Sequence, residues 1–492
     1  MVAARGQVRH PENTITFHRR SAPGRSIPMH VRFLLLAALL GSAAVAAPAR
    51  PPNILHLHAD DHRADGLHAL GTPLLQTPHL DTLVARGTTF TRCYTQGSMV
   101  GAVCLPSRTM LLTGKSWLRI PNGRDAHVDA SQSLPKVLSR AGYTTFHVGK
   151  GGNEFTAGLN AFDTNLRYDD HPVELRRGSS ERHADATITF LRDRRGETAA
   201  AKPFYIYFAP PVPHDPRVAA PEFHGLYDPA QIPLPAAFLP QHPWDNGEMN
   251  VRDEQLAPWP RTPADTKQQL ADYYACVTGL DHHIGRVFAQ LKAMGEWDNT
   301  IIIFTGDNGL SLGEHGLFGK QNLYEFGGMH VPCVIAGPGI PHGRSDALVY
   351  LMDLFPTFCD FAGAPVPAGV EGRSLAPVVR GQTVKVRDVL YTGYRDGQRA
   401  VRDDRWKLIR YPLVDRTQLF DLVADPRELN NLADQPAHAA HVAALTALLQ
   451  REMQRYGDTA PLTVANPRPA AWTPPQNPPP EKKAKGKAAT KS

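Results

Sequence analysis

Five short apolar runs, spaced along the chain and separated by helix-like segments, constrain the fold more than any other feature. Each run is short enough for a strand that is buried on both faces of a sheet. Strands of this kind that alternate with helices form a mainly parallel sheet covered by helices on both faces. The sequence therefore predicts an α/β fold with a large mixed, mainly parallel sheet. The runs are residues 54–58, 144–148, 204–208, 301–305 and 331–336.

Helical periodicity is clearest between about residues 267 and 294, where apolar side chains recur every three or four positions. Shorter helices are expected at 80–86 and 134–141. The proline-rich stretch 210–263 has little periodicity, and we expect it to form long loops on the side of the sheet that carries the active site. The apolar positions of the long helix are Leu270, Tyr273, Val277, Leu280, Ile284, Val287 and Leu291.

The pattern changes near residue 385, which separates a main domain (52–380) from a smaller one (385–456). Short alternating strands with tight turns, followed by one helix around 437–456, predict a small antiparallel α+β subdomain. The predicted strands are residues 389–394, 398–402, 406–410 and 418–421.

The basic character of the chain comes from its ends. The formal net charge is +6, but residues 1–32 carry +5 and residues 481–492 carry +4, which leaves −3 for the segment between them. This distribution gives no reason to expect nucleic-acid binding. Residues 461–492 are rich in Pro, Ala and Lys, and they predict a disordered basic tail.

Residues 33–47 form an uncharged apolar stretch that follows Arg32 and ends in small residues. This pattern is typical of a secretory signal peptide, which we assign to residues 29–47, and it is short for a membrane span. We expect translation to begin at Met29, so that residues 1–28 are an extra or non-native extension. The mature protein is then periplasmic or secreted, without stable membrane insertion.

The segment from Cys104 to Gly114 carries the most informative motif. Pro106 suits the first turn of a helix, and Gly114 suits a helix C-cap. Cys104 would then lie just ahead of the helix N-terminus, where backbone N–H groups favour an anion, with Arg108 one turn further along the same side. The motif predicts a nucleophile that faces an oxyanion site, although a lone cysteine is more often an ordinary buried residue.

Two pairs of oxygen ligands follow predicted strands. Asp60 and Asp61 end the first strand, and Asp307 and Asn308 follow the strand at 301–305. Because the carboxyl ends of parallel strands meet at one edge of a sheet, the two pairs predict an oxygen-rich site for Ca²⁺ or Mg²⁺. Taken alone, the first pair is more typical of a turn or a helix cap than of a metal site.

The motif resembles the sulfatase signature, Cys-x-Pro-Ser-Arg followed by x-x-x-Leu-Thr-Gly, with every fixed position present. Residues 400–434 also resemble the C-terminal region of sulfatases, so the resemblance covers about residues 52–455. It implies the alkaline-phosphatase-like fold. It also implies that a formylglycine-generating enzyme converts Cys104 to 3-oxoalanine (formylglycine), whose hydrate is the nucleophile.

The resemblance also assigns the metal ligands. In the family the matching positions hold one Ca²⁺, together with an oxygen of the formylglycine. By this resemblance the ligands are Asp60, Asp61, Cys104, Asp307 and Asn308.

The remaining roles follow from the same resemblance. Arg108 would hold the formylglycine hydroxyl, and Lys150 and Lys320 would contact the sulfate. His214, in a Pro-His-Asp-Pro segment after the strand at 204–208, would protonate the leaving group. Without the resemblance, Lys150 and Lys320 would be interpreted as surface lysines and His214 as a structural histidine.

Two positions depart from the family pattern. After the strand at 144–148, sulfatases usually have the pattern Lys-x-His, which would begin here at Lys150. Gly152 stands where that histidine belongs, and His147 lies upstream on the strand itself. His330 occupies a position where arginine is frequent. These departures bear on catalytic efficiency more than on the class of reaction.

The sequence thus predicts a calcium-dependent sulfuric ester hydrolase that acts on a sulfated polysaccharide or oligosaccharide. Specificity is expected in the loops 155–177 and 214–263. Two alternatives remain open: a phosphodiesterase or phosphonate monoester hydrolase of the same superfamily, and a non-catalytic protein that binds sulfated glycans.

The chain has five cysteines, which is few for a disulfide scaffold of this size. Besides Cys104, the others could pair or stay as buried thiols: Cys93, Cys276, Cys333 and Cys359.

Overall fold

The computed structural model describes residues 50–120, 129–152, 155–168, 179–194 and 202–474. The described residues from Pro51 onward group as one compact unit. Among the described residues, eight strands form the main sheet in the order β11-β2-β10-β8-β1-β7-β5-β6. Their bounds are β1 Asn53–Ala59, β2 Thr88–Phe90, β5 Thr144–Lys150, β6 Thr164–Tyr168, β7 Phe204–Ala209, β8 Thr300–Gly306, β10 Cys333–Ala336 and β11 Gly343–Ser345.

The sheet is mixed and mainly parallel, as predicted. β8, β1, β7, β5 and β6 run parallel to one another, so their carboxyl ends lie along one edge. β10 is antiparallel to both β8 and β2. Four of the five predicted strands are therefore confirmed with small changes at their ends.

The fifth predicted strand, residues 331–336, is divided. Pro332 separates β9 (His330–Val331) from β10, because proline has no N–H group to donate to a continuous ladder. β9 joins a separate three-stranded sheet with β3 (Cys93–Tyr94) and β12 (Val349–Tyr350). The sequence prediction of one uninterrupted strand was wrong at this point.

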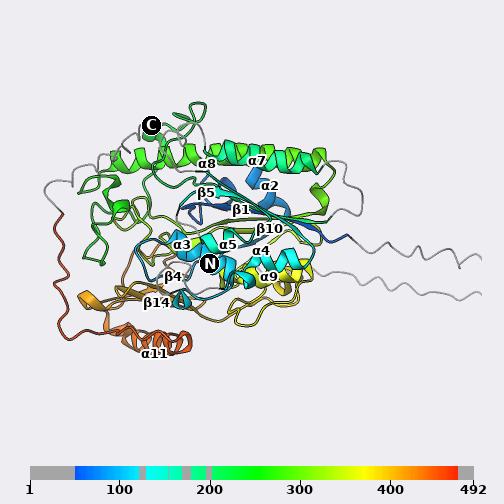
Figure 1. Ribbon diagram of the computed structural model, residues 1–492. Helices are drawn as coiled ribbons and strands as arrows, with labels where there is room; N and C mark the ends of the chain where they lie inside the picture. The colour runs from blue at the N-terminus through cyan, green and yellow to red at the C-terminus, as the bar shows by residue number, and fades with distance from the viewer. Residues whose placement is uncertain (1–49, 121–128, 153–154, 169–178, 195–201, 475–492) are drawn as a thin grey trace, which may run out of the picture. The chain divides into compact units, whose positions relative to one another are not determined.

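Helices cover both faces of the main sheet (Figure 1). On one face lie α2 (Pro78–Arg86), α7 (Ser179–Asp193) and α8 (Pro263–Ala293), and on the other lie α4 (Leu134–Arg140) and α9 (Leu354–Ala362). The expected helices at 80–86, 134–141 and 267–294 are confirmed. α8 begins after Thr262, whose hydroxyl accepts a hydrogen bond from Asp265 N at 3.1 Å.

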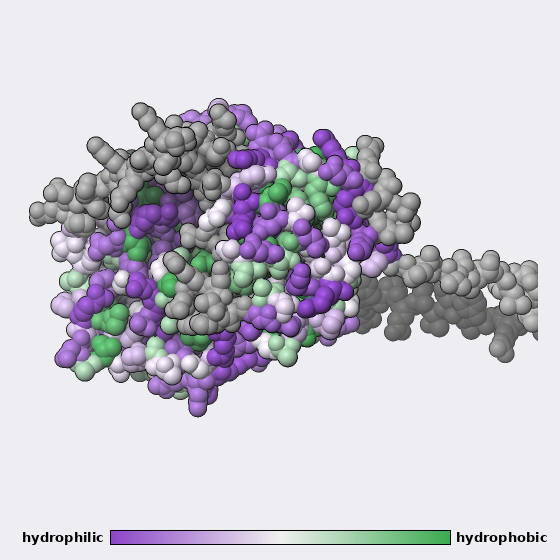
Figure 2. Space-filling view, in the orientation of Figure 1, coloured by the Kyte–Doolittle hydropathy of each residue, from purple (hydrophilic) through white to green (hydrophobic). Residues whose placement is uncertain are grey.

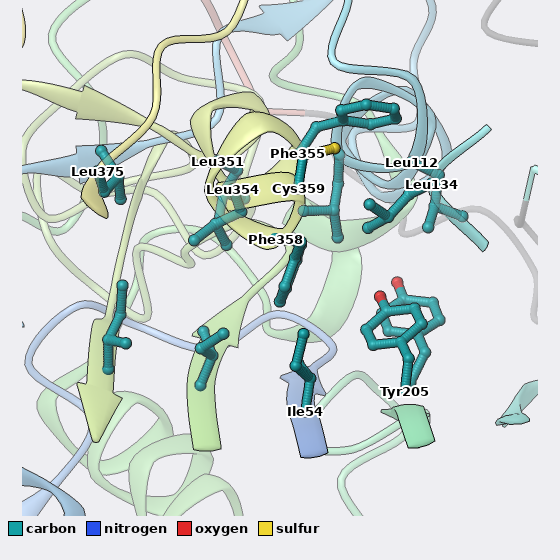
Figure 3. Packing of buried hydrophobic residues seen from close by; sticks show 14 of the residues in the cluster. Ile54, Leu112, Leu134, Tyr205, Leu351, Leu354, Phe355, Phe358, Cys359 and Leu375 are labelled. Atoms are coloured by element: carbon teal, nitrogen blue, oxygen red, sulfur yellow. The ribbon is translucent and has the colours of Figure 1, made fainter. Parts of the chain in front are cut away.

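The strand residues alternate between two hydrophobic clusters. Leu55 and Leu57 of β1 pack on the side of α8, and Ile54 packs on the side of α9. Figure 3 shows Phe358 of α9 pointing down toward Ile54, beside Tyr205 of β7. This period of two, with both sets buried, explains why the strands carry apolar residues on both faces.

A second sheet, β16-β15-β14-β13-β4, makes up the C-terminal region with α11 (Ala439–Tyr456). The predicted antiparallel strands and the helix are confirmed. The sequence missed β4 (Gly97–Ser98), a two-residue strand seven residues ahead of Cys104 that pairs parallel with β13. The antiparallel strands are β13 Leu390–Tyr394, β14 Gln398–Arg402, β15 Trp406–Tyr411 and β16 Arg416–Asp421.

The shorter elements lie mostly in connections. Part of the expected specificity loop 155–177 is regular, because it holds α5 (Thr156–Leu159) and the edge strand β6. Residues 169–178 lie outside the described residues. The remaining elements are α3 Cys104–Thr113, α10 Ala376–Val379, η1 His68–Leu70, η2 Trp117–Arg119, η3 Ala130–Gln132, η4 Pro229–Gln231, η5 Arg252–Leu256, η6 Trp297–Asn299, η7 Leu351–Asp353, η8 Pro412–Val414 and η9 Pro436–His438.

The prediction of a disordered tail from residue 461 onward is wrong for the first part of that segment. Asp245 N donates to Ala470 O at 2.8 Å, and Arg468 N donates to Leu413 O at 2.8 Å. The ring of Trp472 packs edge-on against Trp259, with 5.2 Å between centroids. Residues up to 474 therefore contact the body of the protein, whereas 475–492 lie outside the described residues.

The expected extension at 1–28 and signal peptide at 29–47 also lie outside the described residues. Within the part of the chain that is described, no helix is both long and apolar enough to cross a bilayer. All five cysteines are described, and all are buried and free. The face in Figure 2 shows hydrophilic residues surrounding scattered hydrophobic ones.

Asp281 of α8 connects this helix to α2, and we expect the connection to contribute to stability. Its carboxylate accepts hydrogen bonds from His79 N at 3.1 Å and Leu80 N at 2.7 Å, which are unsatisfied donors in the first turn of α2. Asp281→Ala is expected to lower the free energy of unfolding by about 1–3 kcal/mol, because it leaves one buried and one partly buried backbone donor without acceptors. Urea denaturation measures the change.

Two further variants make the test specific. Asp281→Asn keeps one carbonyl acceptor and should lose less, while Asp272→Ala removes a carboxylate on the same helix that only bonds Gln268. Equal losses for Asp281→Ala and Asp272→Ala would contradict the capping role.

Candidate active site

Four adjacent parallel strands bring the predicted site residues to one edge of the sheet. Asp60 and Asp61 follow β1, and Asp307 follows β8. Lys150 is the last residue of β5, and His214 lies on the segment that leaves β7. This edge, at the carboxyl ends of the strands, is where open α/β sheets place ligand sites.

Helix α3 presents the cysteine motif to the same edge. Cys104 is the first residue of the helix, so it lies within the first turn rather than just ahead of it. Gly114 is the C-cap with φ 65°, and its N–H donates to Met110 O, as expected. The helix is attached to the end of β8, because Ser107 Oγ donates to Asp307 O at 2.5 Å.

The oxygen ligands include three atoms without partners. Asp60 Oδ1, Asp61 Oδ2 and Asn308 Oδ1 are buried and have no hydrogen-bond donor among the described residues. The Asn308 amide nitrogen instead donates to Asp61 Oδ1 at 2.8 Å, which leaves its carbonyl oxygen available. Burying such acceptors unsatisfied is costly, and a hard divalent cation with oxygen ligands would satisfy them.

The backbone and the ligand spacing also suit a cation. Asp61 has φ 61°, an uncommon conformation for a residue other than glycine. Ligand atoms of Asp60, Asp61, Cys104 and His214 all lie within 4.8 Å of one another. The residues present therefore fit a divalent metal ion, with Asp60, Asp61 and Asn308 as its oxygen donors.

Two lysines pair with the acidic residues. Lys150 Nζ lies 2.5 Å from Asp60 Oδ2, and Lys320 Nζ lies 2.6 Å from Asp61 Oδ1 and 3.2 Å from Cys104 Sγ. Burial works against every one of these charges, yet the neighbouring cations hold the pKa of each carboxyl group below its ordinary value. Likewise, the carboxylates raise the pKa of both lysines, so the pairs stay ionised.

Arg108 completes the charge balance. Its Nε donates to Asp307 Oδ2 at 2.8 Å, and neither side chain is exposed. Burial and the charge of Asp60 raise the pKa of Asp307 despite this arginine. The formal charges of the inner residues then cancel, with three carboxylates (Asp60, Asp61, Asp307) against three cations (Arg108, Lys150, Lys320).

The thiol of Cys104 is a poor nucleophile in this setting. Burial, with the carboxylates of Asp307 and Asp60, raises its pKa well above the ordinary value. Since the thiolate is the reactive form of cysteine, the side chain stays protonated near neutral pH. The arrangement around Cys104 therefore does not suit ordinary thiol catalysis.

His214 points one ring nitrogen into the site. Its Nδ1 lies 2.7 Å from Asp215 O, and since a carbonyl only accepts, the Nδ1 atom carries a hydrogen. Its Nε2 faces inward and lies 3.7 Å from Asp61 Oδ2. A ring held in this way can carry a transferable proton on Nε2.

The residues that depart from the family pattern are not among the charged residues at the centre of the site. Gly152 is exposed, and a Cβ atom added there would meet no atom within 4 Å. His147 is buried in β5, and its Nδ1 bonds Asn165 Oδ1 at 2.8 Å. The His330 ring stacks on Tyr94 with 4.6 Å between centroids, so it serves packing.

The sequence analysis missed η5, which links two parts of the site. The Glu254 carboxylate accepts hydrogen bonds from Phe318 N at 2.9 Å and Gly319 N at 2.7 Å, directly before Lys320. Asp253 accepts from Gln321 Nε2 at 2.8 Å, directly after it. Nothing in the aperiodic proline-rich stretch signalled this role, because it depends on a contact 64 to 68 residues away in sequence.

Family models support the interpretation of the geometry. Residues 52–364 match the Sulfatase family model, and residues 313–455 match the model of the N-sulphoglucosamine sulphohydrolase C-terminal region. Together the two matches cover the main sheet and the C-terminal sheet.

The similarity of this chain to known proteins agrees with the sulfatase family match. An N-acetylglucosamine-6-O-sulfatase of Bacteroides thetaiotaomicron is 28% identical, with 87% of this chain and 91% of that protein covered. A solved structure of a protein with its substrate D-glucosamine-2-N,6-O-disulfate has a TM-score of 0.67 and 25% identity, covering 84% of this chain and 99% of that one.

The fold is also that of a phosphonate monoester hydrolase from Silicibacter pomeroyi, with a TM-score of 0.68 and 24% identity, covering 83% of this chain and 96% of that one. These structures confirm the predicted fold class. Given the family match over most of the chain, the protein belongs to the sulfatase family and is a sulfuric ester hydrolase.

Proposed function

We propose that this protein hydrolyses a sulfate ester on a sulfated carbohydrate, using formylglycine at position 104 and one Ca²⁺. The observation that carries the proposal is the convergence of Cys104, three unpartnered oxygen ligands and three buried cations at the end of the sheet. The sulfated sugars named for the relatives support a carbohydrate substrate.

Each inner residue has a role in this proposal. When bound, the calcium ion supplies Lewis-acid polarisation of the ester. With Asp60 and Asp61 engaged by the cation, the ammonium groups of Lys150 and Lys320 are available for sulfate oxygens. Arg108 holds the hydroxyl of residue 104.

The reaction would proceed in two covalent steps. In the first, one hydroxyl of the hydrated formylglycine releases its proton to solvent as its oxygen attacks sulfur, an O–S bond forms, the ester O–S bond breaks, and His214 Nε2–H protonates the departing alcohol. In the second, the other hydroxyl gives its proton to the now neutral His214, the carbonyl re-forms, and the sulfate leaves with the electrons of the C–O bond. Addition of water to the aldehyde restores the diol.

A phosphonate monoester is the second candidate substrate. Sulfate monoesters and phosphonate monoesters each carry one negative charge, and the fold is shared with a phosphonate monoester hydrolase. The three carboxylates and three cations of the inner residues cancel, so the positive charge available to such an ester comes from the divalent cation and from His214 when both of its ring nitrogens carry hydrogen.

Maturation and location belong to the same proposal. Residues 29–47 would direct export to the periplasm or outside the cell, and a formylglycine-generating enzyme would modify Cys104. Residues 52–380 would form the catalytic domain and 385–456 the C-terminal subdomain.

The first prediction concerns residue 104. In protein from a host with a formylglycine-generating system, mass spectrometry of the peptide containing Cys104 should show the aldehyde or its hydrate. Cys104→Ala should lower kcat/KM for sulfate esters by at least about 10³-fold, because the nucleophile is removed.

Cys276→Ala is the matched control, since Cys276 is a buried thiol on α8 outside the site, and its activity should stay near that of the wild type. Paired sulfate and phosphonate monoesters distinguish the two candidate reactions. If Cys104 stays an unmodified thiol in a host that modifies a known sulfatase, the catalytic proposal is contradicted and the glycan-binding alternative is favoured.

A second prediction concerns the metal. Chelation should abolish turnover and lower Tm, and about 100 Kd of calcium should restore both, raising Tm by about 3–6 °C. Asp61→Asn should remove this calcium-dependent shift, because it removes a charged ligand. The exposed Asp298→Asn should keep it. A calcium-induced shift that survives in Asp61→Asn would contradict the assigned site.

A further inference from the structure

Arg252, the first residue of η5, lies against the proposed proton donor. Its Nη2 is 3.4 Å from His214 Nε2, the ring nitrogen that faces the site, and 3.0 Å from Asp215 Oδ1. Since His214 would protonate the leaving oxygen, Arg252 borders the space in which the leaving alcohol must lie.

The inner edge of this guanidinium is held in place. Arg252 Nη2 and Nε donate to Asp253 Oδ1 at 2.6 and 3.0 Å. Asp253 is buried and fixed in turn by Gln321 Nε2 on its other oxygen at 2.8 Å. Although burial acts to raise it, Lys320 and Arg252 lower the pKa of Asp253, so the carboxylate stays ionised. Arg252 is therefore positioned before any ligand arrives, which reduces the entropy lost on binding.

The outer edge of the same guanidinium faces solvent. The Arg252 side chain is 61% exposed, and its Nη1 makes no hydrogen bond to any described residue. Arg108, in contrast, is completely buried against Asp307. A guanidinium that is anchored on one edge and open on the other is suited to receive an anionic group through charge-assisted hydrogen bonds.

Resting on the proposed function, we propose that Arg252 recognises a second anionic group on the leaving-group side of the substrate. The preferred substrate class is then a sulfated sugar that carries a further sulfate or carboxylate. Three carboxylates, Asp61, Asp215 and Asp253, lie close to Arg252. The other cation near them, Lys320, pairs with Asp61 and is assigned to the sulfate that is cleaved, so a second anion on this side depends on Arg252.

The test compares pairs of sulfate esters that differ by one anionic group. Three pairs suffice: N-sulfate against N-acetyl on a glucosamine 6-sulfate, carboxylate against hydroxymethyl, and a second O-sulfate against hydroxyl. The formylglycine-containing, calcium-loaded protein is compared with Arg252→Ala, Arg252→Lys and Arg405→Ala. Arg405 is the matched control because it is similarly exposed, at 58%, and similarly paired, with Asp421 in the C-terminal sheet.

The wild type should favour the doubly anionic member of at least one pair by about tenfold or more. Arg252→Ala should lower kcat/KM for that member about 30-fold, mainly through KM, and for its partner less than about fivefold. Arg252→Lys should recover part of the loss, and Arg405→Ala should match the wild type. Thermal melts verify that each variant is folded.

Equal losses on both members of every pair would overturn the proposal and make Arg252 a positioning residue for His214. The absence of any loss would overturn it as well. Failure of the proposed function is distinguishable, because the wild type, with formylglycine verified by mass, would then turn over no sulfate ester in the panel.

Discussion

The compensation of buried charge is the constraint on which the site depends. Three carboxylates without solvent access would be prohibitively costly if they stood alone, and even paired charges demand good geometry. The structure meets this requirement by bringing one cation to each acidic residue from a different element: α3, the end of β5 and the loop after β8. The pairs are Arg108 with Asp307, Lys150 with Asp60 and Lys320 with Asp61. Removing one member leaves an uncompensated charge, so the acidic cluster and its cations form a single structural unit.

The C-terminal sheet belongs to this unit rather than standing apart from it. Gln398 of β14 donates to Gln321 O at 2.9 Å and Asn246 O at 3.1 Å, so it ties the sheet to the loops on both sides of the site. β4 extends the same sheet from the segment just before α3, where a Cβ at Gly97 would clash with Gly393 O. Packing of this sheet therefore helps to set where Lys320 and the start of α3 lie.

Much of the architecture could be predicted because strands that are buried on both faces contain short apolar runs in the sequence. The strands β1, β5, β7 and β8 each contain several buried apolar residues, and α8 repeats its apolar positions every three or four residues. The predictions failed where tertiary contacts override local pattern. Pro332 interrupts a run that looks continuous, and the proline-rich residues 461–474 are held by partners far away in the sequence. Nothing local distinguishes β6 from a loop, since it gains its regularity by pairing with β5.

The sequence by itself determined the class of fold, and it predicted the position of the nucleophile and the identities of the acidic and cationic residues of the site. These are local matters: strand ends, a helix start and residue types in a motif. Only the tertiary structure decided which lysine meets which carboxylate, which three oxygens remain without partners, and which nitrogen of His214 faces the site. It also placed Arg252 beside that histidine, 38 residues away along the chain. Such relations arise when strands distant in sequence align in parallel, because distance through space is set by the sheet and not by the order of the chain.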